Sequence, residues 1–208
     1  MQLISHRGYW VNESEKNTIQ AFKRAFDFDF GAEIDLREHK GELLVSHDLL
    51  NGKELNFDEI LSIWDGKTNL AINIKEDGLA SIVHSKMKPY SKDNWFVFDM
   101  SIPDTISHLK IGNPVFIRMS DIEKDIHLIN DSSGVWLDAF HSIWYNLNLI
   151  EEILNKNKKI CLVSPELHKF DHYALWDYVK LLNRNKNIYL CTDFPKEARS
   201  FFERLEND

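Results

Sequence analysis

The organisation of the chain is clearest in residues 3–36, LISHRGYWVNESEKNTIQAFKRAFDFDFGAEIDL. This stretch opens with a short apolar run at Leu3–Ser5 and continues into an amphipathic segment at Thr18–Phe28, whose apolar residues recur at helical spacing. A second short run follows at Glu33–Leu36. Because such short runs are typical of buried strands, the stretch predicts a strand, a helix and a second strand.

The same alternation continues to the end of the chain. Further short apolar runs, which predict strands, are Leu43–His47, Leu70–Lys75, Trp95–Met100, Val115–Met119, Val135–Phe140, Ile160–Val163 and Ile188–Thr192. Further amphipathic segments, which predict helices, are Phe57–Trp64, Leu147–Lys156, Tyr173–Asn183 and Lys196–Leu205. Eight strand-then-helix units predict an α/β fold, a closed (β/α)8 TIM barrel with residues 1–208 as a single domain. The alternative is an open doubly wound sheet, against which the lack of a glycine-rich first turn argues.

Charge and composition exclude several classes of protein. The 208 residues carry a formal net charge of −8 and no Lys/Arg-rich run, which argues against nucleic acid as the partner. No signal peptide and no apolar run long enough for a membrane span are found. Cys161 and Cys191 lie in short apolar segments, as buried reduced thiols do. We therefore expect a cytoplasmic protein; its oligomeric state stays open.

Polar residues gather where the predicted strands end, which is where a closed barrel places its active site. These residues are His6, Arg7, His47, Asp48, Asn73, Lys75, Asp138, Ser164, Glu166, Thr192 and Asp193. Taken singly, a histidine in such a place is more often an ordinary polar residue of a turn. Two histidines, an arginine and two strand acids at one barrel end favour a reaction centre instead.

Glu33 and Asp35 are two positions apart on one strand, so their side chains point to the same face. Two carboxylates in a barrel interior repel each other unless a cation lies between them. Hard cations such as Mg²⁺ and Ca²⁺ take oxygen ligands of this type. The spacing therefore predicts one divalent cation, Mg²⁺ or Ca²⁺, at this pair. The alternative is that both acids face solvent.

Four segments, in this order and spacing, resemble the signature of the glycerophosphodiester phosphodiesterase family. They are Ile4–Gly8, Asn17–Phe22, Gly31–Asp35 and Val45–Asp48. Two further similarities, at Leu70–Lys75 and Thr192–Pro195, correspond to the family's third and last strands. The resemblance covers residues 76–187 in architecture only.

The resemblance implies metal-dependent hydrolysis of a small anionic phosphodiester, a glycerophosphodiester or a related compound. It gives the site residues three roles: His6 and His47 as general acid and base, Arg7 and Lys75 as phosphate ligands, and Glu33, Asp35 and Asn73 as cation ligands. A cation and an arginine suit this reaction because negative charge grows on the phosphoryl oxygens in the transition state. Related barrel phospholipases, which cyclise their substrate, are a neighbouring possibility.

Three departures from the family pattern are visible. Lys16 replaces the acid of the family's Pro-Glu-Asn-Thr motif, and the sequence leaves open whether Glu15 compensates. Asn73 stands where the family carries a third acidic metal ligand, so Asp138 or Glu166 becomes a candidate to complete the site. The segment from His47 to Asn73 is also short, which predicts an open mouth. Lys16 and Asn73 favour a second hypothesis, a catalytically degenerate barrel that binds a phosphate ligand without turnover.

Overall fold

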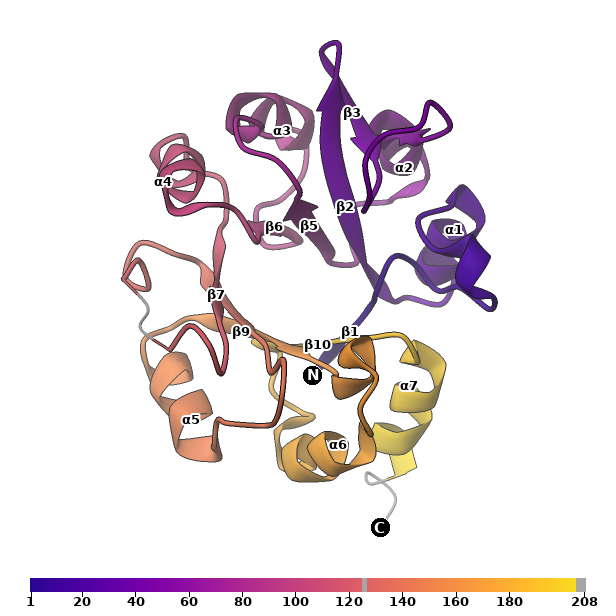
Figure 1. The fold of residues 1–208 in the computed structure, drawn as a ribbon. Helices are drawn as coiled ribbons and strands as arrows, with labels where there is room; N and C mark the ends of the chain where they lie inside the picture. The colour runs from indigo at the N-terminus through magenta and orange to yellow at the C-terminus, as the bar shows by residue number, and fades with distance from the viewer. Residues whose placement is uncertain (125–126, 205–208) are drawn as a thin grey trace.

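The computed structural model describes residues 1–124 and 127–204, with the strands at the centre and the helices outside (Figure 1). The strands are β1 (Gln2–Ser5), β2 (Gly31–His39), β3 (Glu42–Val45), β4 (Leu55–Asn56), β5 (Leu70–Ile74), β6 (Trp95–Phe98), β7 (Phe116–Met119), β8 (Gly134–Leu137), β9 (Lys159–Val163) and β10 (Ile188–Thr192). The helices are α1 (Ile19–Asp27), α2 (Phe57–Ile63), α3 (Ala80–Met87), α4 (Ile102–Lys110), α5 (Leu147–Asn155), α6 (Tyr173–Val179) and α7 (Pro195–Arg204). Three short 3-10 helices are η1 (Glu13–Glu15), η2 (Pro165–His168) and η3 (Lys180–Leu182).

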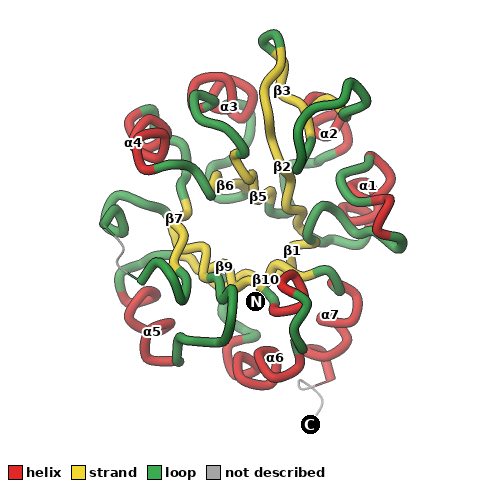
Figure 2. The backbone as a smooth tube through the Cα atoms, in the orientation of Figure 1, coloured by secondary structure: helices red, strands yellow, loops and turns green. Residues whose placement is uncertain are grey.

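The strands other than β3 and β4 pair in parallel and curve around a common centre, and Figure 2 shows the helices outside them. From β1 the pairing runs through β2 and β5 to β6 in one direction, and through β10, β9 and β8 to β7 in the other. Between β6 and β7 the pairing is reduced to an isolated parallel bridge of Val97 with Val115. There the Val97 N–H donates to the carbonyl of Pro114 at 2.9 Å. The predicted α/β class, with a parallel sheet inside outer helices, is confirmed.

Strand β2 is longer than its neighbours and turns back on itself as a hairpin. Its second half pairs with β3 in antiparallel register, with Leu36 opposite Val45. The turn is made by Lys40 and Gly41, both with positive φ, which suits the twist of a two-residue hairpin. The returning segment rejoins the sheet at Ser46, whose N–H donates to the carbonyl of Asp35. This hairpin brings the residues after β3 beside the end of the barrel part of β2.

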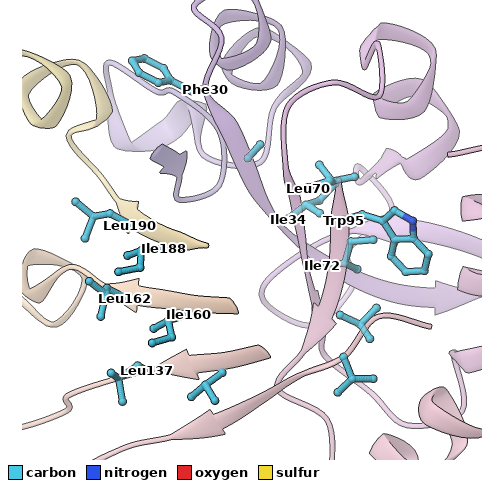
Figure 3. Packing of buried hydrophobic residues seen from close by; sticks show 14 of the residues in the cluster. Phe30, Ile34, Leu70, Ile72, Trp95, Leu137, Ile160, Leu162, Ile188 and Leu190 are labelled. Carbon is cyan, nitrogen blue, oxygen red and sulfur yellow. The ribbon is translucent and has the colours of Figure 1, made fainter. Parts of the chain in front are cut away.

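Alternation along the strands produces two separate cores. Outward-facing residues pack against the helices; Figure 3 labels Phe30, Ile34, Leu70, Ile72, Trp95, Leu137, Ile160, Leu162, Ile188 and Leu190 from this cluster. Inward-facing residues fill the ring, where Phe96 stacks on Phe116 at 3.7 Å and Phe98 on Trp136 at 3.8 Å. Because aromatic side chains fill it, the interior is a packed core and ligands are confined to its ends.

The first helix illustrates how local sequence places the elements. Thr18 caps α1, and its hydroxyl accepts from the Ala21 N–H. Ala21, Phe22 and Ala25 form the buried face at the predicted helical spacing. Helix α7 starts at Pro195, close to the predicted Lys196, whereas the predicted end at Leu205 lies outside the described residues.

The prediction of eight strand-then-helix units is wrong at one place. Between β7 and β8 the described residues, 120–124 and 127–133, form turns and no helix. The Ser120 hydroxyl accepts from the N–H groups of Ile122 and Glu123, a local bonding pattern that competes with helix formation. Both cysteines are free and buried, as predicted. Among the described residues, no helix combines the length and the apolar character needed to span a membrane.

Candidate active site

A tight turn after β1 positions the first two site residues. Arg7 and Gly8 both have positive φ angles, 57° and 84°. A Cβ at Gly8 would lie 2.8 Å from the carbonyl carbon of Ala21, so glycine allows the turn to pack against α1. The Asn17 N–H donates to the carbonyl of Arg7 at 3.0 Å. His6 and Arg7 are thereby held at the carboxyl end of β1.

His6 is oriented from the neighbouring last strand. Its Nδ1 lies 2.7 Å from Oδ1 of Asp193, and its Nε2 lies 4.0 Å from Oε2 of Glu33. Because an ionised carboxylate only accepts hydrogen bonds, Nδ1 carries the proton and Nε2 of the neutral ring is an acceptor. Burial lowers the pKa of His6, and the contact with Asp193 opposes this in part. A neutral imidazole with a free Nε2 is suited to accept a proton.

Glu33 is buried beside that ring, with 2% of its surface exposed. One of its oxygens accepts from the Arg7 N–H at 3.1 Å. Burial, reinforced by the charge of Asp35, raises the pKa of Glu33 well above its usual range. The ionised form of Glu33 therefore needs additional positive charge nearby.

Asp35 is fully buried and lies between two basic side chains. Its Oδ2 accepts from Nδ2 of Asn17 at 2.9 Å and lies 3.2 Å from Nε of Arg7. Its Oδ1 lies 3.7 Å from Nζ of Lys75. The structure thus brings Arg7 and Lys75, the two predicted phosphate ligands, to the predicted metal-binding acids. Their charges balance part of the negative charge of the pair.

Among the described residues, three buried side-chain oxygens at this place have no hydrogen-bond partner: Oδ1 of Asn17, of Asp35 and of Asn73. Asp35 and Asn73 are register partners on β2 and β5, so they face the same side of the ring. Oxygens left unsatisfied in a buried site are suited to a hard cation. With Glu33 they form a small oxygen donor set, and Mg²⁺ commonly keeps several water ligands besides one or two carboxylates. The residues therefore fit the predicted cation.

His47 follows the hairpin strand β3 and lies at the same end of the parallel strands as Arg7. It lines a cleft of about 700 Å³ together with Arg7, Asn17 and Ser46. Its Nδ1 lies 2.8 Å from Oδ1 of Asp48, and its side chain is 42% exposed. The side chain of His47 is thus more exposed than that of His6, and the cleft is open to solvent, as the short segment after it predicts.

The candidate replacements for the family's missing acids are engaged elsewhere. Glu15 pairs with Arg24 at 2.8 Å, so it does not compensate for Lys16. Asp138 accepts from Nε2 of His168 at 2.7 Å and also from the Ala139 N–H. Over residues 1–124 and 127–204, no group of three or more His, Cys, Asp and Glu has metal-binding geometry. Asn73 places a buried oxygen without a described hydrogen-bond partner opposite Asp35, whereas Glu15 and Asp138 do not.

Glu166 is also excluded as a replacement ligand, since it builds the end of the last strand. It accepts from the hydroxyls of Ser164 and Thr192 and from the Asp193 N–H. These bonds hold Asp193, which in turn orients His6. The sequence showed these polar strand ends without indicating that they form one chain of contacts.

Arg37 is a further residue that the sequence analysis missed. Its guanidinium donates to the carbonyl of His47 at 3.1 Å and to that of Lys75 at 3.3 Å. The side chain thus ties the segment after β3 to the end of β5. Arg37 follows Asp35 by two positions on the same strand face, and that spacing is the signal that would have found it.

Several solved structures of phosphodiesterases share this arrangement of strands and helices. A glycerophosphodiester phosphodiesterase from Parabacteroides distasonis matches with a TM-score of 0.71 at 15% identity, over 99% of this chain and 98% of that one. One from Thermotoga maritima matches with 0.70 at 18% identity, over 97% of both chains. A phosphodiesterase from Oleispira antarctica, solved with the product sn-glycerol-3-phosphate, gives 0.73 at 15% identity, over 98% and 97%.

These matches confirm the predicted resemblance at the level of the fold. The chain has the fold of the glycerophosphodiester phosphodiesterases, hydrolases that act on phosphodiesters, along nearly its whole length. No protein-family model and no curated protein matches the sequence. The roles of the site residues therefore rest on their geometry.

Proposed function

We propose that the chain is a metal-dependent phosphodiesterase that hydrolyses a small anionic phosphodiester at the ends of β1, β2 and β5. The proposal includes that the Val97–Val115 bridge closes the eight parallel strands into a (β/α)8 barrel. The observation that carries it is the contact chain from Asp193 through His6 to Glu33. A histidine oriented by one acid and facing a second, buried acid is an arrangement for moving a proton beside a charged substrate.

The cation, Mg²⁺ or Ca²⁺, would be held by Glu33, Asp35 and Asn73. Bound there, it would supply positive charge to the phosphoryl oxygens. Arg7 and Lys75 would bind the same phosphate, since both lie against Asp35 and carry donors that an anion can share. In a buried site these charges act with little screening by water.

The two histidines would move the protons. His6 would accept a proton at Nε2, because Asp193 holds its Nδ1–H and burial favours the neutral ring. His47 would donate to the leaving alkoxide, because the contact of its Nδ1 with Oδ1 of Asp48 at 2.8 Å orients the ring. His47 lines the open cleft together with Arg7, the residue that follows His6.

The alternative function is a phosphate-binding barrel without turnover. Its favouring observation is that Asn73 brings no charge to the cation and that neither Glu15 nor Asp138 replaces the missing acid. A barrel of this kind would still bind glycerol phosphate through Arg7 and Lys75. The cytoplasmic location inferred from the sequence remains a prediction.

One experiment separates these functions. The purified chain is incubated with bis(4-nitrophenyl) phosphate and with diglyceryl phosphodiester, with Mg²⁺ or Ca²⁺ and then with a chelator. We expect turnover that the chelator abolishes and that either cation restores. Binding of glycerol phosphate without turnover at any cation concentration would establish the degenerate barrel. Turnover that survives the chelator would overturn the metal dependence.

A further inference from the structure

The segment that carries His47 is joined to the rest of the chain by few hydrogen bonds. It follows β3, and pairing with that strand resumes only at Leu55 in β4. In the described part of the chain, residues 47–54 bond among themselves and to Ser46, and Arg37 supplies the remaining hydrogen bond to this segment. The His47 side chain is 42% exposed, so packing constrains it little. The position of its imidazole therefore depends on the contact with Arg37.

The pleat of β2 places Arg37 where it makes that contact. Asp35 and Arg37 are two positions apart on the strand, so their side chains point to the same face. The Arg37 guanidinium donates to the carbonyl of His47 at 3.1 Å and to that of Lys75 at 3.3 Å. One planar group therefore joins the proposed proton donor to the strand end that carries a proposed phosphate ligand.

The guanidinium is itself fixed from a third direction. Its Nη1 lies 3.6 Å from Oε2 of Glu76, and Oε1 of Glu76 accepts from the Glu38 N–H. The Arg37 side chain is 16% exposed, and its rigid fork loses little freedom when it forms two bonds. Nη1 thus serves Lys75 and Glu76, Nη2 serves His47, and Nε is buried. Arg37 is accordingly suited to act through the residues that it holds, and not as a ligand of the phosphate.

We propose that Arg37 is a positioning residue for the reaction: it holds His47 at the distance from the phosphate at which the imidazole protonates the leaving alkoxide. This assignment rests on the proposed hydrolase function and adds to it a residue that touches neither substrate nor cation. Proton transfer requires the donor to lie within hydrogen-bond reach of the leaving oxygen, and a misplacement of about 1 Å can cost about a hundredfold in rate. Loss of the bridge should therefore slow the proton transfer.

The test compares two substrates that differ in their need for a proton donor. The alkoxide of diglyceryl phosphodiester has to be protonated as it leaves, whereas the nitrophenolate of bis(4-nitrophenyl) phosphate is a weak base and leaves unprotonated. For Arg37→Gln we expect kcat on the diglyceryl substrate to fall about tenfold, with KM within about twofold. On the aryl substrate kcat should fall less than about threefold. His47→Ala should show the same selectivity with a larger loss.

A double-mutant cycle shows whether Arg37 acts through His47. In the His47→Ala background, Arg37→Gln should change kcat on the diglyceryl substrate by less than about twofold, because the group that it positions is gone. The matched control is Arg118, whose described side-chain hydrogen bonds go to Asp99 at 2.5 Å and Glu123 at 2.7 Å. Arg118→Gln should have the same effect in both backgrounds and on both substrates.

A second variant, Arg37→Lys, carries the test if Arg37→Gln does not fold. Its ammonium keeps the charge and reaches one of the two carbonyls, so kcat on the diglyceryl substrate should fall only about threefold, with the same selectivity. Equal losses on both substrates, a loss confined to KM, or a loss that persists undiminished in the His47→Ala background would overturn the assignment.

Failure of the hydrolase proposal gives a different result. If the unaltered chain hydrolyses neither diester, trypsin digestion replaces the kinetics, because Lys53 is exposed in the segment that follows His47. Cleavage after Lys53 that is about tenfold faster in Arg37→Gln than in the unaltered chain would keep the hold on this segment while removing the catalytic role. Equal cleavage rates in the two chains would remove the hold too.

Discussion

The barrel mouth has a reaction side, at the ends of β1, β2, β5 and β10, and an opposite side, at the ends of β7, β8 and β9. The two sides differ in how their polar groups are satisfied. On the opposite side the acids have histidine partners, such as Asp138 with His168 and Asp121 with His141. On the reaction side Oδ1 of Asp35 lies 3.7 Å from Nζ of Lys75 and, like Oδ1 of Asn73, accepts no hydrogen bond from the described residues. A satisfied pair stabilises a wall of the site, whereas an unsatisfied buried oxygen costs free energy until a ligand completes it. The polar groups of one side stabilise the structure, whereas those of the other side are suited to bind a ligand.

The largest effect should come from removing the two histidines of the reaction side. His6→Ala and His47→Ala should each lower turnover of a susceptible diester by about two orders of magnitude or more, because each removes a proton-transfer group. Steady-state rates at saturating substrate measure this. If both variants kept near-normal rates while His168→Gln lost kcat, the two sides would have to exchange roles.

The next effect concerns the cation. Asp35→Asn should weaken binding of Mg²⁺ or Ca²⁺ by about a hundredfold, since it removes a charge at the site. Titration calorimetry of the cation alone measures this, and Asp138→Asn is the matched control on the opposite side. We expect Asp138→Asn to bind the cation as the unaltered chain does. If Asp138→Asn weakened cation binding more than Asp35→Asn, the ion would have to bind on the opposite side.

Asn73 sharpens the comparison further. Asn73→Glu should tighten cation binding by about tenfold, or about 1.4 kcal/mol, because it adds a charged ligand next to Asp35. The gain is smaller than a full charge pair since the added carboxylate also repels its neighbours. Affinity measured for this variant, alone and combined with Asp138→Asn, should be the same. Unchanged affinity in both would place the ion away from β5.

A smaller effect is expected from Asp193→Asn. The aspartate raises the pKa of His6 against the lowering caused by burial, so its loss should lower that pKa further. The acidic limb of the rate profile should then move to lower pH, with a lower plateau than in the unaltered chain. The loss should be less than for His6→Ala. If the acidic limb of the pH–rate profile did not move, a group other than His6 would be responsible for it.

The remaining effect is on stability. The pKa of Glu33 is raised in the folded chain, so between its usual value and the folded one the native state holds the extra proton. The free energy of unfolding in a chelator should therefore fall as pH rises through this window, by about 1.4 kcal/mol for each pH step of about one. Chemical denaturation at a series of pH values above the usual pKa of a glutamate measures this slope, and Glu33→Gln should remove it. A slope that persists in the variant would belong to another group.

The local sequence pattern predicted most of the fold, because the periodicity of strands and helices depends on residues that are close together in the sequence. The runs at Leu70–Lys75 and Ile188–Thr192 became β5 and β10, and the spacing at Thr18–Phe28 became α1 with its cap. The helix expected between β7 and β8 failed because Ser120 bonds its own backbone neighbours. The sequence pattern gives little sign that side-chain bonds to nearby backbone groups will compete with a helix, and only the structure shows these bonds.

The sequence predicted which residues form the site, and the tertiary structure showed which residues contact them. Spacing alone put Glu33 and Asp35 on one face, and the resemblance added His6, His47, Arg7 and Lys75 as catalytic and phosphate-binding residues. Only the tertiary structure decided that Asp193 orients His6 and that Asp138 belongs to His168. The physical reason is distance along the chain: residues 187 positions apart, such as His6 and Asp193, meet only when the first and last strands pair. Periodicity is local information, whereas the partner of a buried charge is set by the neighbours that folding brings to it.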